Sequence, residues 1–130
     1  MSKRNSFTVS ARLPSLNDYV LACRAHWSKG AKLIQQTEDL IIWAIRSAKN
    51  RGDCRPVKGP CMVEFIWYEG DKRRDLDNIY SAKKYILDAM QKAGIIENDD
   101  RKHVVGLCDE IRDTAKGCDR VHVVIWEVDE

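Results

Sequence analysis

The chain has 130 residues, of which 44% are hydrophobic and 32% are charged. That amount of apolar material supports one domain with a modest core and leaves little room for a second domain. The formal net charge of +2 is too small to indicate a nucleic-acid partner by itself. The sequence contains no long uncharged apolar run, so we expect a cytoplasmic protein with neither a signal peptide nor a membrane-spanning helix.

The cysteines follow neither a disulfide pattern nor a metal-site pattern. They are odd in number, and none of them forms a Cys-x-x-Cys pair. The five positions are Cys23, Cys54, Cys61, Cys108 and Cys118. His103 and His122 lie near the last two of these, but without the spacing of a zinc site. We therefore expect buried or unreactive thiols and no structural zinc.

The first half of the chain predicts one strand and one long helix. Residues 7–13 alternate apolar and polar side chains, which is the period of a half-buried strand, and Pro14 ends it. From residue 31 to about residue 49, apolar side chains recur at helical spacing, and Gly52 follows just beyond the end. A strand followed by a helix begins an alternating pattern.

Strand and helix signals alternate again in the second half. Residues 61–68 form an apolar run that predicts a strand leading directly into a charged segment. A helix is predicted from about residue 78 to residue 93. Asp77 or Asn78 can cap its start, and Gly94 can end it.

Two closing strands complete the pattern. They are predicted at residues 104–107 and 121–126, joined through a polar turn around Lys116 and Gly117. The expected fold is α/β in the broad sense, more strictly α+β. It has a small mixed sheet of about four strands with two main helices, in one domain that covers residues 1–130.

The most informative segment follows the second predicted strand and reads Arg-Arg-Asp-Leu-Asp-Asn from residue 73 to residue 78. Asp75 and Asp77 are two positions apart, so an extended backbone would place both carboxylates on the same side. A third carboxylate, from the acidic loop at residues 97–100, could complete an oxygen-ligand cage of the kind that Mg²⁺ prefers. The two preceding arginines would face phosphate. Acids for a metal beside bases for a phosphate indicate an enzyme that acts on the phosphodiesters of a nucleic acid.

One face of the helix predicted at residues 78–93 adds a cation to this segment. Four residues at steps of four, three and four would lie along one side of a continuous helix: Asp77, Ser81, Lys84 and Asp88. Lys84 could reach a phosphate bound near Asp77, or it could pair with Asp88 as a surface ion pair that contributes little. The spacing alone leaves both roles open.

Three stretches of the chain together resemble the RusA family, whose members are Holliday-junction resolvases. They are Asp75–Asn78, Ile86–Met90 and Lys92–Asp99. Residues 14–19, Pro-Ser-Leu-Asn-Asp-Tyr, also resemble the family's N-terminal Pro-Ser-x-Asn-x-Tyr element, so the similarity touches most of the chain in the right order. The resemblance implies a small α/β homodimer that binds four-way DNA junctions. It also implies that Mg²⁺, or Mn²⁺ in its place, is used to nick two opposing strands in DNA recombination and repair.

The resemblance also implies roles for individual residues. Asp75, Asp77 and Asp99 correspond to the metal-binding acids of the active site, and Lys84 corresponds to its catalytic lysine. Metal ions held by these acids would activate water and orient the scissile phosphate. Lys84 would neutralise charge that develops on the phosphate in the transition state. Asp100 does not keep the motif's distance from the preceding glycine, so Asp99 is preferred.

One departure from the family pattern leaves the identity of the lysine open. The stretch between Asn78 and Leu87 is about three residues longer than in the best-known members. Alignment backward from Leu87 selects Lys84. Alignment forward from the acidic motif selects Ser81 instead, and Lys83 is a neighbouring alternative.

Several polar and basic residues are candidates for DNA contacts. They are Asn17, Tyr19, Lys29, Lys32, Arg73, Arg74 and Asn78. Trp27, with His26 and the nearby lysines, could form a basic and aromatic loop that contacts an opened base or the backbone. A folded connector with an ordinary buried Trp27 is an equal alternative. Asn78 could position a ligand, although capping of a helix is the commoner reason for Asn at such a position.

Two other interpretations compete with an active resolvase. The chain could bind junctions or duplexes without cleaving them, with the carboxylates as remnants. It could also be a structural or partner-binding protein in which Asp75 and Asp77 cap a helix while Asp99 and Asp100 shape a turn.

Overall fold

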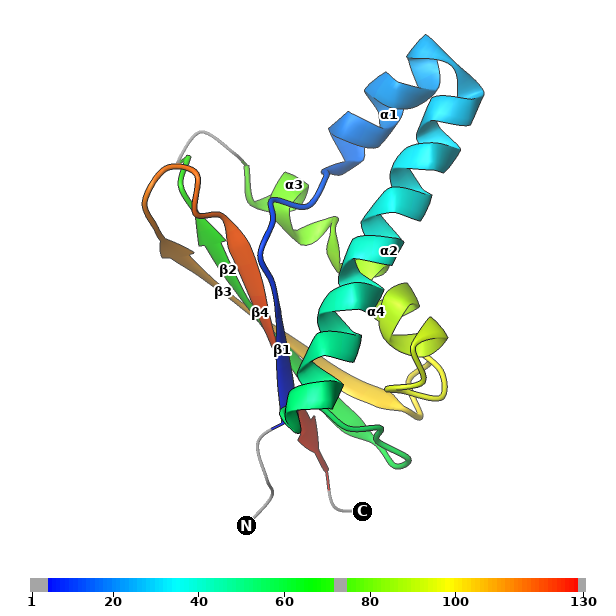
Figure 1. Ribbon diagram of the computed structural model, residues 1–130, viewed down its shortest axis with the longest axis vertical. Helices are drawn as coiled ribbons and strands as arrows, with labels where there is room; N and C mark the ends of the chain where they lie inside the picture. Colours follow the sequence, from blue (N-terminus) through cyan, green and yellow to red (C-terminus); the bar gives the residue numbers. More distant parts are fainter. Residues whose placement is uncertain (1–4, 72–74, 129–130) are drawn as a thin grey trace.

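The computed structural model describes residues 5–71 and 75–128, with Asn78 described by its backbone only (Figure 1). In chain order its elements are β1 (Asn5–Val9), α1 (Leu16–Ala25), α2 (Trp27–Arg51), β2 (Cys61–Glu69), α3 (Leu76–Tyr80), α4 (Lys83–Lys92), β3 (Val104–Asp113) and β4 (Arg120–Glu127). The mixed α+β fold expected from the sequence is confirmed. Within the described residues, no helix is both long enough and apolar enough to cross a membrane.

The strands form one mixed sheet in the order β1-β4-β2-β3. β4 runs antiparallel to both of its neighbours, so that Val123 lies opposite Phe7 on one side and Phe65 on the other. β2 and β3 run parallel. Parallel neighbours cannot be joined by a tight turn, and the connection between these two, residues 70–103, carries α3 and α4.

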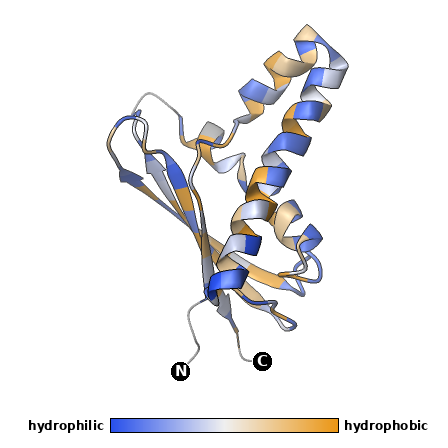
Figure 2. Cartoon of the chain, viewed as in Figure 1, coloured by the Kyte–Doolittle hydropathy of each residue, from blue (hydrophilic) through white to orange (hydrophobic). Residues whose placement is uncertain are grey.

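The core lies between one face of the sheet and the helices α2 and α4 (Figure 1). Every second strand residue faces it, because successive side chains of a strand point to opposite faces. Large buried side chains meet there: Phe7, Val9, Val63, Phe65, Val123, Ile125, Ile41, Ile45, Ile86 and Met90. Apolar and polar residues alternate along α2, as expected for a helix with one buried side (Figure 2). Lys92 of α4 also pairs with the buried Glu38 of α2, which ties the two helices together.

The single helix predicted over residues 78–93 is wrong, because the structure divides this stretch into α3 and α4. The break lies at Ser81 and Ala82. The hydroxyl of Ser81 accepts a hydrogen bond from the backbone N–H of Leu16 at 3.1 Å, and the residues just before it have only modest helix propensity. The acidic motif and Lys84 therefore lie on different helices, and the continuous face expected to join them is absent.

Helix α1 has no counterpart in the sequence-based prediction, which starts its first helix at residue 31. The start of α1 is a capping box, in which the N–H of Asp18 donates to Ser15 Oγ at 3.2 Å and the N–H of Ser15 donates to Asp18 Oδ2 at 2.8 Å. No residue of α1 is buried. Apolar side chains recur at helical spacing at Leu16, Tyr19, Val20 and Cys23, but over only ten residues, and the sequence-based prediction missed this short helix.

The strands begin close to their predicted positions but differ in length. β1 ends at Val9 rather than at residue 13, because its pairing with β4 stops at Val9. β3 extends to Asp113, well beyond residue 107, because it pairs along the whole of β2. Gly94 follows the end of α4 with a positive φ of 77°, in agreement with its predicted role as a helix stop.

Substitution of Gly30 should weaken the packing of α1 against α2. A Cβ at this buried position would lie 2.3 Å from the Sγ of Cys23 and 3.2 Å from the ring of Tyr19. Overpacking costs about 1–3 kcal/mol, and the higher helix propensity of alanine offsets about 1 kcal/mol of that. We expect Gly30→Ala to speed hydrogen exchange of the α1 amides, with a net cost of up to about 2 kcal/mol in local stability.

Gly59→Ala is the matched control, since a Cβ at that position meets no atom within 4 Å. Adding Cys23→Ala to Gly30→Ala removes the atom in closest contact and should restore slow exchange. If α1 amides exchanged at the same rate in Gly30→Ala as in the wild type, the close approach of the two helices would be wrong.

Candidate active site

Asp75 and Asp77 lie where the chain enters α3. Asp75 holds the N-cap position with an extended backbone (φ −67°, ψ 149°), but its side chain makes no capping hydrogen bond. Asp77 follows in the first turn of the helix. Both residues are exposed, and neither carboxylate has an ion-pair partner within the described part of the chain. Two exposed carboxylates that do not cap the helix remain available to a ligand.

Lys84 lies in the first turn of α4 and contacts the second acidic motif. Its Nζ lies 3.2 Å from Asp88 Oδ1 and 3.6 Å from Asp99 Oδ2. The hydrogen bond with Asp88, together with the charges of both carboxylates, raises the pKa of Lys84 above its usual value. The ammonium is therefore charged at neutral pH, and its side chain is 69% exposed. The structure brings Lys84 beside Asp99, whereas Asp77 is not among its ion-pair partners.

Lys83 points the other way, into the protein. Its Nζ lies 2.7 Å from Asp109 Oδ2 on β3 and 5.0 Å from the centroid of the Tyr80 ring. Asp109 also accepts a hydrogen bond from Trp67 Nε1 at 2.9 Å. Both members of the ion pair are largely buried, so Lys83 anchors α4 to the sheet. Of the two lysines, Lys84 is the one that a ligand in solution can reach.

The loop after α4 presents Asp99 to Lys84. Ile95 and Ile96 are buried and fix the start of this loop in the core. The backbone N–H of Asp99 then donates to Asn98 Oδ1 at 2.8 Å, which holds a tight turn. The carboxylate of Asp99 remains directed at Lys84.

His103 lies between two carboxylates of the same loop. Its Nδ1 is 2.6 Å from Asp100 Oδ1, and its Nε2 is 3.3 Å from Glu97 Oε2. The hydrogen bond with Asp100 raises the pKa of His103, and Glu97 adds to the effect. The same hydrogen bond lowers the pKa of Asp100. Asp100 thus shapes the loop, which separates its role from that of Asp99.

The described residues contain no group of three or more His, Cys, Asp or Glu side chains that could hold a metal ion. Asp75, Asp77 and Asp99 supply the oxygen donors that Mg²⁺ prefers. The chain does not gather them into a cage, and Lys84 lies beside Asp99 instead. In this arrangement the three acids do not fit a preformed metal site, and Mg²⁺ binding stays a prediction.

The candidates for DNA contacts fall into three groups. Exposed on the surface are Asn17 of α1 and Lys29 and Lys32 of α2. Tyr19 turns toward its own hairpin, where a hydrogen bond with Cys23 raises the pKa of Tyr19. Outside the described residues lie Arg73, Arg74 and the side chain of Asn78.

Trp27 is the first residue of α2 and is 76% exposed. The alternative of a folded connector with an ordinary buried Trp27 is therefore wrong. Its ring lies 5.5 Å from that of His26 between centroids, tilted by 32°. The connector between α1 and α2 is a single residue, His26.

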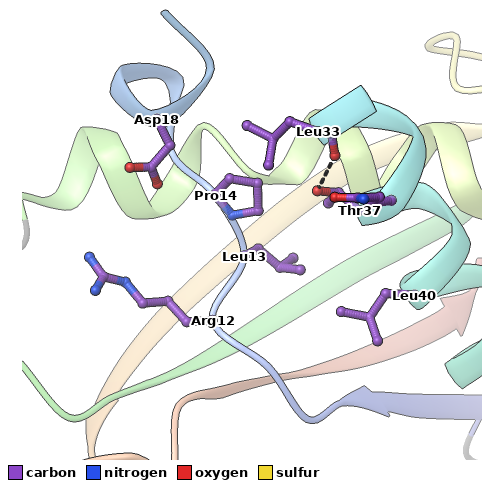
Figure 3. A pocket seen from close by; sticks show the side chains of 8 residues that line it. Arg12, Leu13, Pro14, Asp18, Leu33, Thr37 and Leu40 are labelled. Atoms are coloured by element: carbon purple, nitrogen blue, oxygen red, sulfur yellow. Dashed lines mark hydrogen bonds between the residues drawn. The ribbon is translucent and has the colours of Figure 1, made fainter. Parts of the chain in front are cut away.

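A cavity of about 430 Å³ lies between the segment after β1 and the helices α1 and α2 (Figure 3). Its lining residues are Arg12, Leu13, Pro14, Asp18, Leu33, Gln36, Thr37 and Leu40. The hydroxyl of Thr37 donates to the carbonyl of Leu33 at 2.7 Å, so this polar group is already satisfied. None of the candidate acids lines the cavity. Three separated segments form the cavity, so no single sequence motif predicts it.

All five cysteines are free thiols. Burial raises the pKa of the Cys54 thiol to about 11. Burial also raises the pKa of Cys61. These two thiols are therefore protonated and poor nucleophiles at neutral pH.

A scan against models of known protein families finds no match to this chain, and a search of curated proteins finds no matching relative. The similarity to the RusA family therefore rests on the motifs and on their order along the chain.

Removal of the Asp100 carboxylate should return the titration of His103 toward that of an ordinary histidine. Asp100 is the larger of the two causes of the raised pKa, so Asp100→Asn should lower the midpoint more than Glu97→Gln does. Imidazole NMR signals followed between about pH 4 and pH 9 measure the midpoint directly. Equal midpoints in the wild type and Asp100→Asn would show that the two side chains do not interact in solution.

The same contact gives the loop a window of pH in which it is most stable. The contribution of His103 is fully present below the pKa of an unfolded histidine and is lost as the pH rises through the raised folded pKa. The contribution of Asp100 is present above the pKa of an unfolded aspartate and is lost as the pH falls through the lowered folded pKa. The loop that carries Asp99 should therefore be best ordered between those two folded-state values.

Proposed function

We propose that the chain is a metal-dependent endodeoxyribonuclease that resolves four-way DNA junctions by paired hydrolysis of phosphodiesters. The observation that carries the proposal is the ion pair between Lys84 and Asp99. These residues come from two separate motifs, and the resemblance to the RusA family assigns both to one active site. Their contact is what that assignment requires, and Lys83, the competing lysine, has a structural partner instead.

The chemistry needs a positive charge that can reach a phosphate. Lys84 supplies it, because its raised pKa keeps it charged and its side chain is exposed. A phosphate that approached Lys84 would compete with Asp88 and Asp99 for the ammonium, and both of those contacts are weak, partly exposed ion pairs. Stabilisation of charge in the transition state is the role in which a positioned cation is most effective.

The acids require a change of arrangement before they can act together. Asp75 and Asp77 are exposed at the start of α3, while Asp99 is held by Lys84. On this proposal Asp75, Asp77 and Asp99 would hold the metal only once a phosphate had replaced Asp99 at Lys84, and the metal would supply activation of water and stabilisation of charge on the phosphate. Mn²⁺ has similar ligand preferences and would substitute for Mg²⁺.

A homodimer is part of the proposal, because the substrate is symmetric. A two-fold dimer presents two equivalent sites to two strands of matching geometry. Paired nicks at opposing strands then follow from symmetry rather than from two different catalytic centres.

Asp75→Asn should abolish cleavage of a synthetic four-way junction in Mg²⁺ while leaving junction binding nearly unchanged. The amide keeps the size of the side chain but removes a charge from the acids, so we expect a loss of at least about a hundredfold in rate. Asp39→Asn, at an exposed acid of α2, is the matched control and should cleave normally. Loss of binding together with cleavage, in a variant that is still folded, would indicate a structural role for Asp75 instead.

The same assay separates the competing interpretations. Junction binding without cleavage in either Mg²⁺ or Mn²⁺ would identify a catalytically inactive binder. Absence of both binding and cleavage would leave a structural or partner-binding protein.

Lys84→Ala and Lys83→Ala should have opposite effects. Lys84→Ala should slow cleavage by about a hundred- to a thousandfold and change the free energy of unfolding by less than about 1 kcal/mol, since its ion pairs are exposed. Lys83→Ala leaves Asp109 buried without its partner and should cost about 1–3 kcal/mol in stability. Its cleavage rate should stay near that of the wild type at temperatures where it is folded.

Urea unfolding measures the predicted effect on stability, and single-turnover cleavage measures the predicted effect on rate, both on the same preparations of each variant. Lys83→Met serves as a control that keeps the packing of the aliphatic stem. If the two lysines exchanged these effects, the assignment of Lys84 to the site would be wrong.

A further inference from the structure

The hairpin tip, defined as residues 21–32 at the junction of α1 and α2, stands away from the sheet (Figure 1). Its outer residues from Arg24 to Lys29 are all exposed. No acid occurs between Asp18 and Glu38, although 20 of the 130 residues are acidic. The cations in this interval are Arg24, Lys29 and Lys32, with His26 beside them. The tip is therefore a purely basic surface on a chain that is otherwise nearly neutral.

Trp27 lies at the centre of this basic surface. At 76% exposure, it is the most exposed large hydrophobic side chain among the described residues. An indole in water leaves a large apolar and aromatic area without a partner. The packing of the fold does not use Trp27, so the exposed ring is available to a ligand.

The base of the hairpin is fixed beside the segment that carries the candidate acids. The backbone N–H of Leu16 donates to the hydroxyl of Ser81, which directly follows α3, at 3.1 Å. Nearer the tip, Gly30 of α2 allows Cys23 and Tyr19 of α1 to pack closely against α2. The tip is thus held in a defined position relative to α3, rather than attached by a flexible linker.

We propose that the hairpin tip is a nucleic-acid contact in which Trp27 stacks on an unpaired base while Arg24, Lys29 and Lys32 lie against the phosphates. An exposed aromatic ring surrounded by cations is the combination by which proteins hold unpaired nucleotides. The residues that share the helix face of Trp27 are Gly30 and Ala31, so no stripe of large apolar side chains continues from the ring along α2, which disfavours insertion into a lipid bilayer. The inference rests on the proposed function for the identity of the nucleic acid as DNA, with the unpaired base at the branch point.

The test measures binding of the full chain to a fluorescein-labelled four-way junction by anisotropy, in EDTA so that no cleavage occurs. Trp27→Ala should weaken binding by about 5- to 100-fold, and Trp27→Phe should weaken it less, because stacking scales with aromatic area. Trp43→Ala is the matched control, since Trp43 is 68% exposed on the same helix but outside the tip. Its affinity should stay within about twofold of the wild type. An affinity of Trp27→Ala equal to that of the wild type overturns the proposal.

A second junction, with abasic sites in place of the bases at the branch point, tests stacking itself. The wild type should bind it about as weakly as Trp27→Ala binds the intact junction, and Trp27→Ala should show no further loss. The logarithm of the binding constant falls linearly with the logarithm of the salt concentration. The double variant Lys29→Gln, Lys32→Gln should make this slope shallower by about one unit or more, whereas Trp27→Ala should not change it. An equal loss by Trp27→Ala on intact and abasic junctions overturns the stacking of Trp27.

The outcomes distinguish this contact from the proposed activity. If the junction is never cleaved but the effect of Trp27 on binding holds, the enzyme proposal fails and the contact stands. If the junction is cleaved and bound without regard to Trp27, the contact fails and the activity stands. If Trp27→Ala lost binding to phosphatidylglycerol vesicles while its binding to DNA stayed equal to that of the wild type, the tip would be assigned to a membrane surface and the proposal overturned.

Discussion

The parallel pairing of β2 with β3 is the constraint on which the rest of the molecule depends. Neighbouring parallel strands require the chain to leave one end of the sheet and return to the other, so a long connection is unavoidable. This connection supplies the helix α4 that closes the core, and it also holds Asp75, Asp77, Lys84 and Asp99. Every residue that the resemblance assigns to the active site therefore lies in one crossover. The geometry of that site depends on how α3 and α4 are seated against the sheet.

Two adjacent lysines of α4, Lys83 and Lys84, face in different directions and have different partners. Consecutive residues of a helix point about 100° apart. The buried side chains of Ile86, Ala89 and Met90 fix the rotation of α4 about its axis, and Lys83 pairs with Asp109 on the same inward side. Lys84 is consequently turned outward, toward the loop of Asp99. The buried face of α4 thus determines which way Lys84 points, and no property of Lys84 itself is needed to explain its direction.

Much of the architecture could be read from the sequence, because strands and the long helix leave a periodic pattern of apolar residues. The break between α3 and α4 could not, since it lies where Ser81 accepts a hydrogen bond from Leu16, a residue far away in the chain. Helix α1 was missed because it is short, so its apolar residues repeat at helical spacing over only ten residues. Spacing allowed Lys84 either to pair with Asp88, which the structure confirms, or to reach a phosphate near Asp77, but only the folded chain shows that Asp99 is also its neighbour. Local patterns predict local structure, whereas the contacts of the site join segments that the sequence keeps apart.

Helix α2 has 25 residues, which makes it a rod about 37 Å long. Its second half is built into the core, from Thr37 through Ala48, while its first half projects with Gly30 as its only buried residue. A helix bends little over such a length, so a small tilt at the buried end becomes a larger displacement at the free end. The small side chains of Ala44 and Ala48 set how closely α2 approaches the sheet, and so they aim the hairpin from a distance. Residues that never meet a ligand can therefore influence where the exposed end of α2 lies.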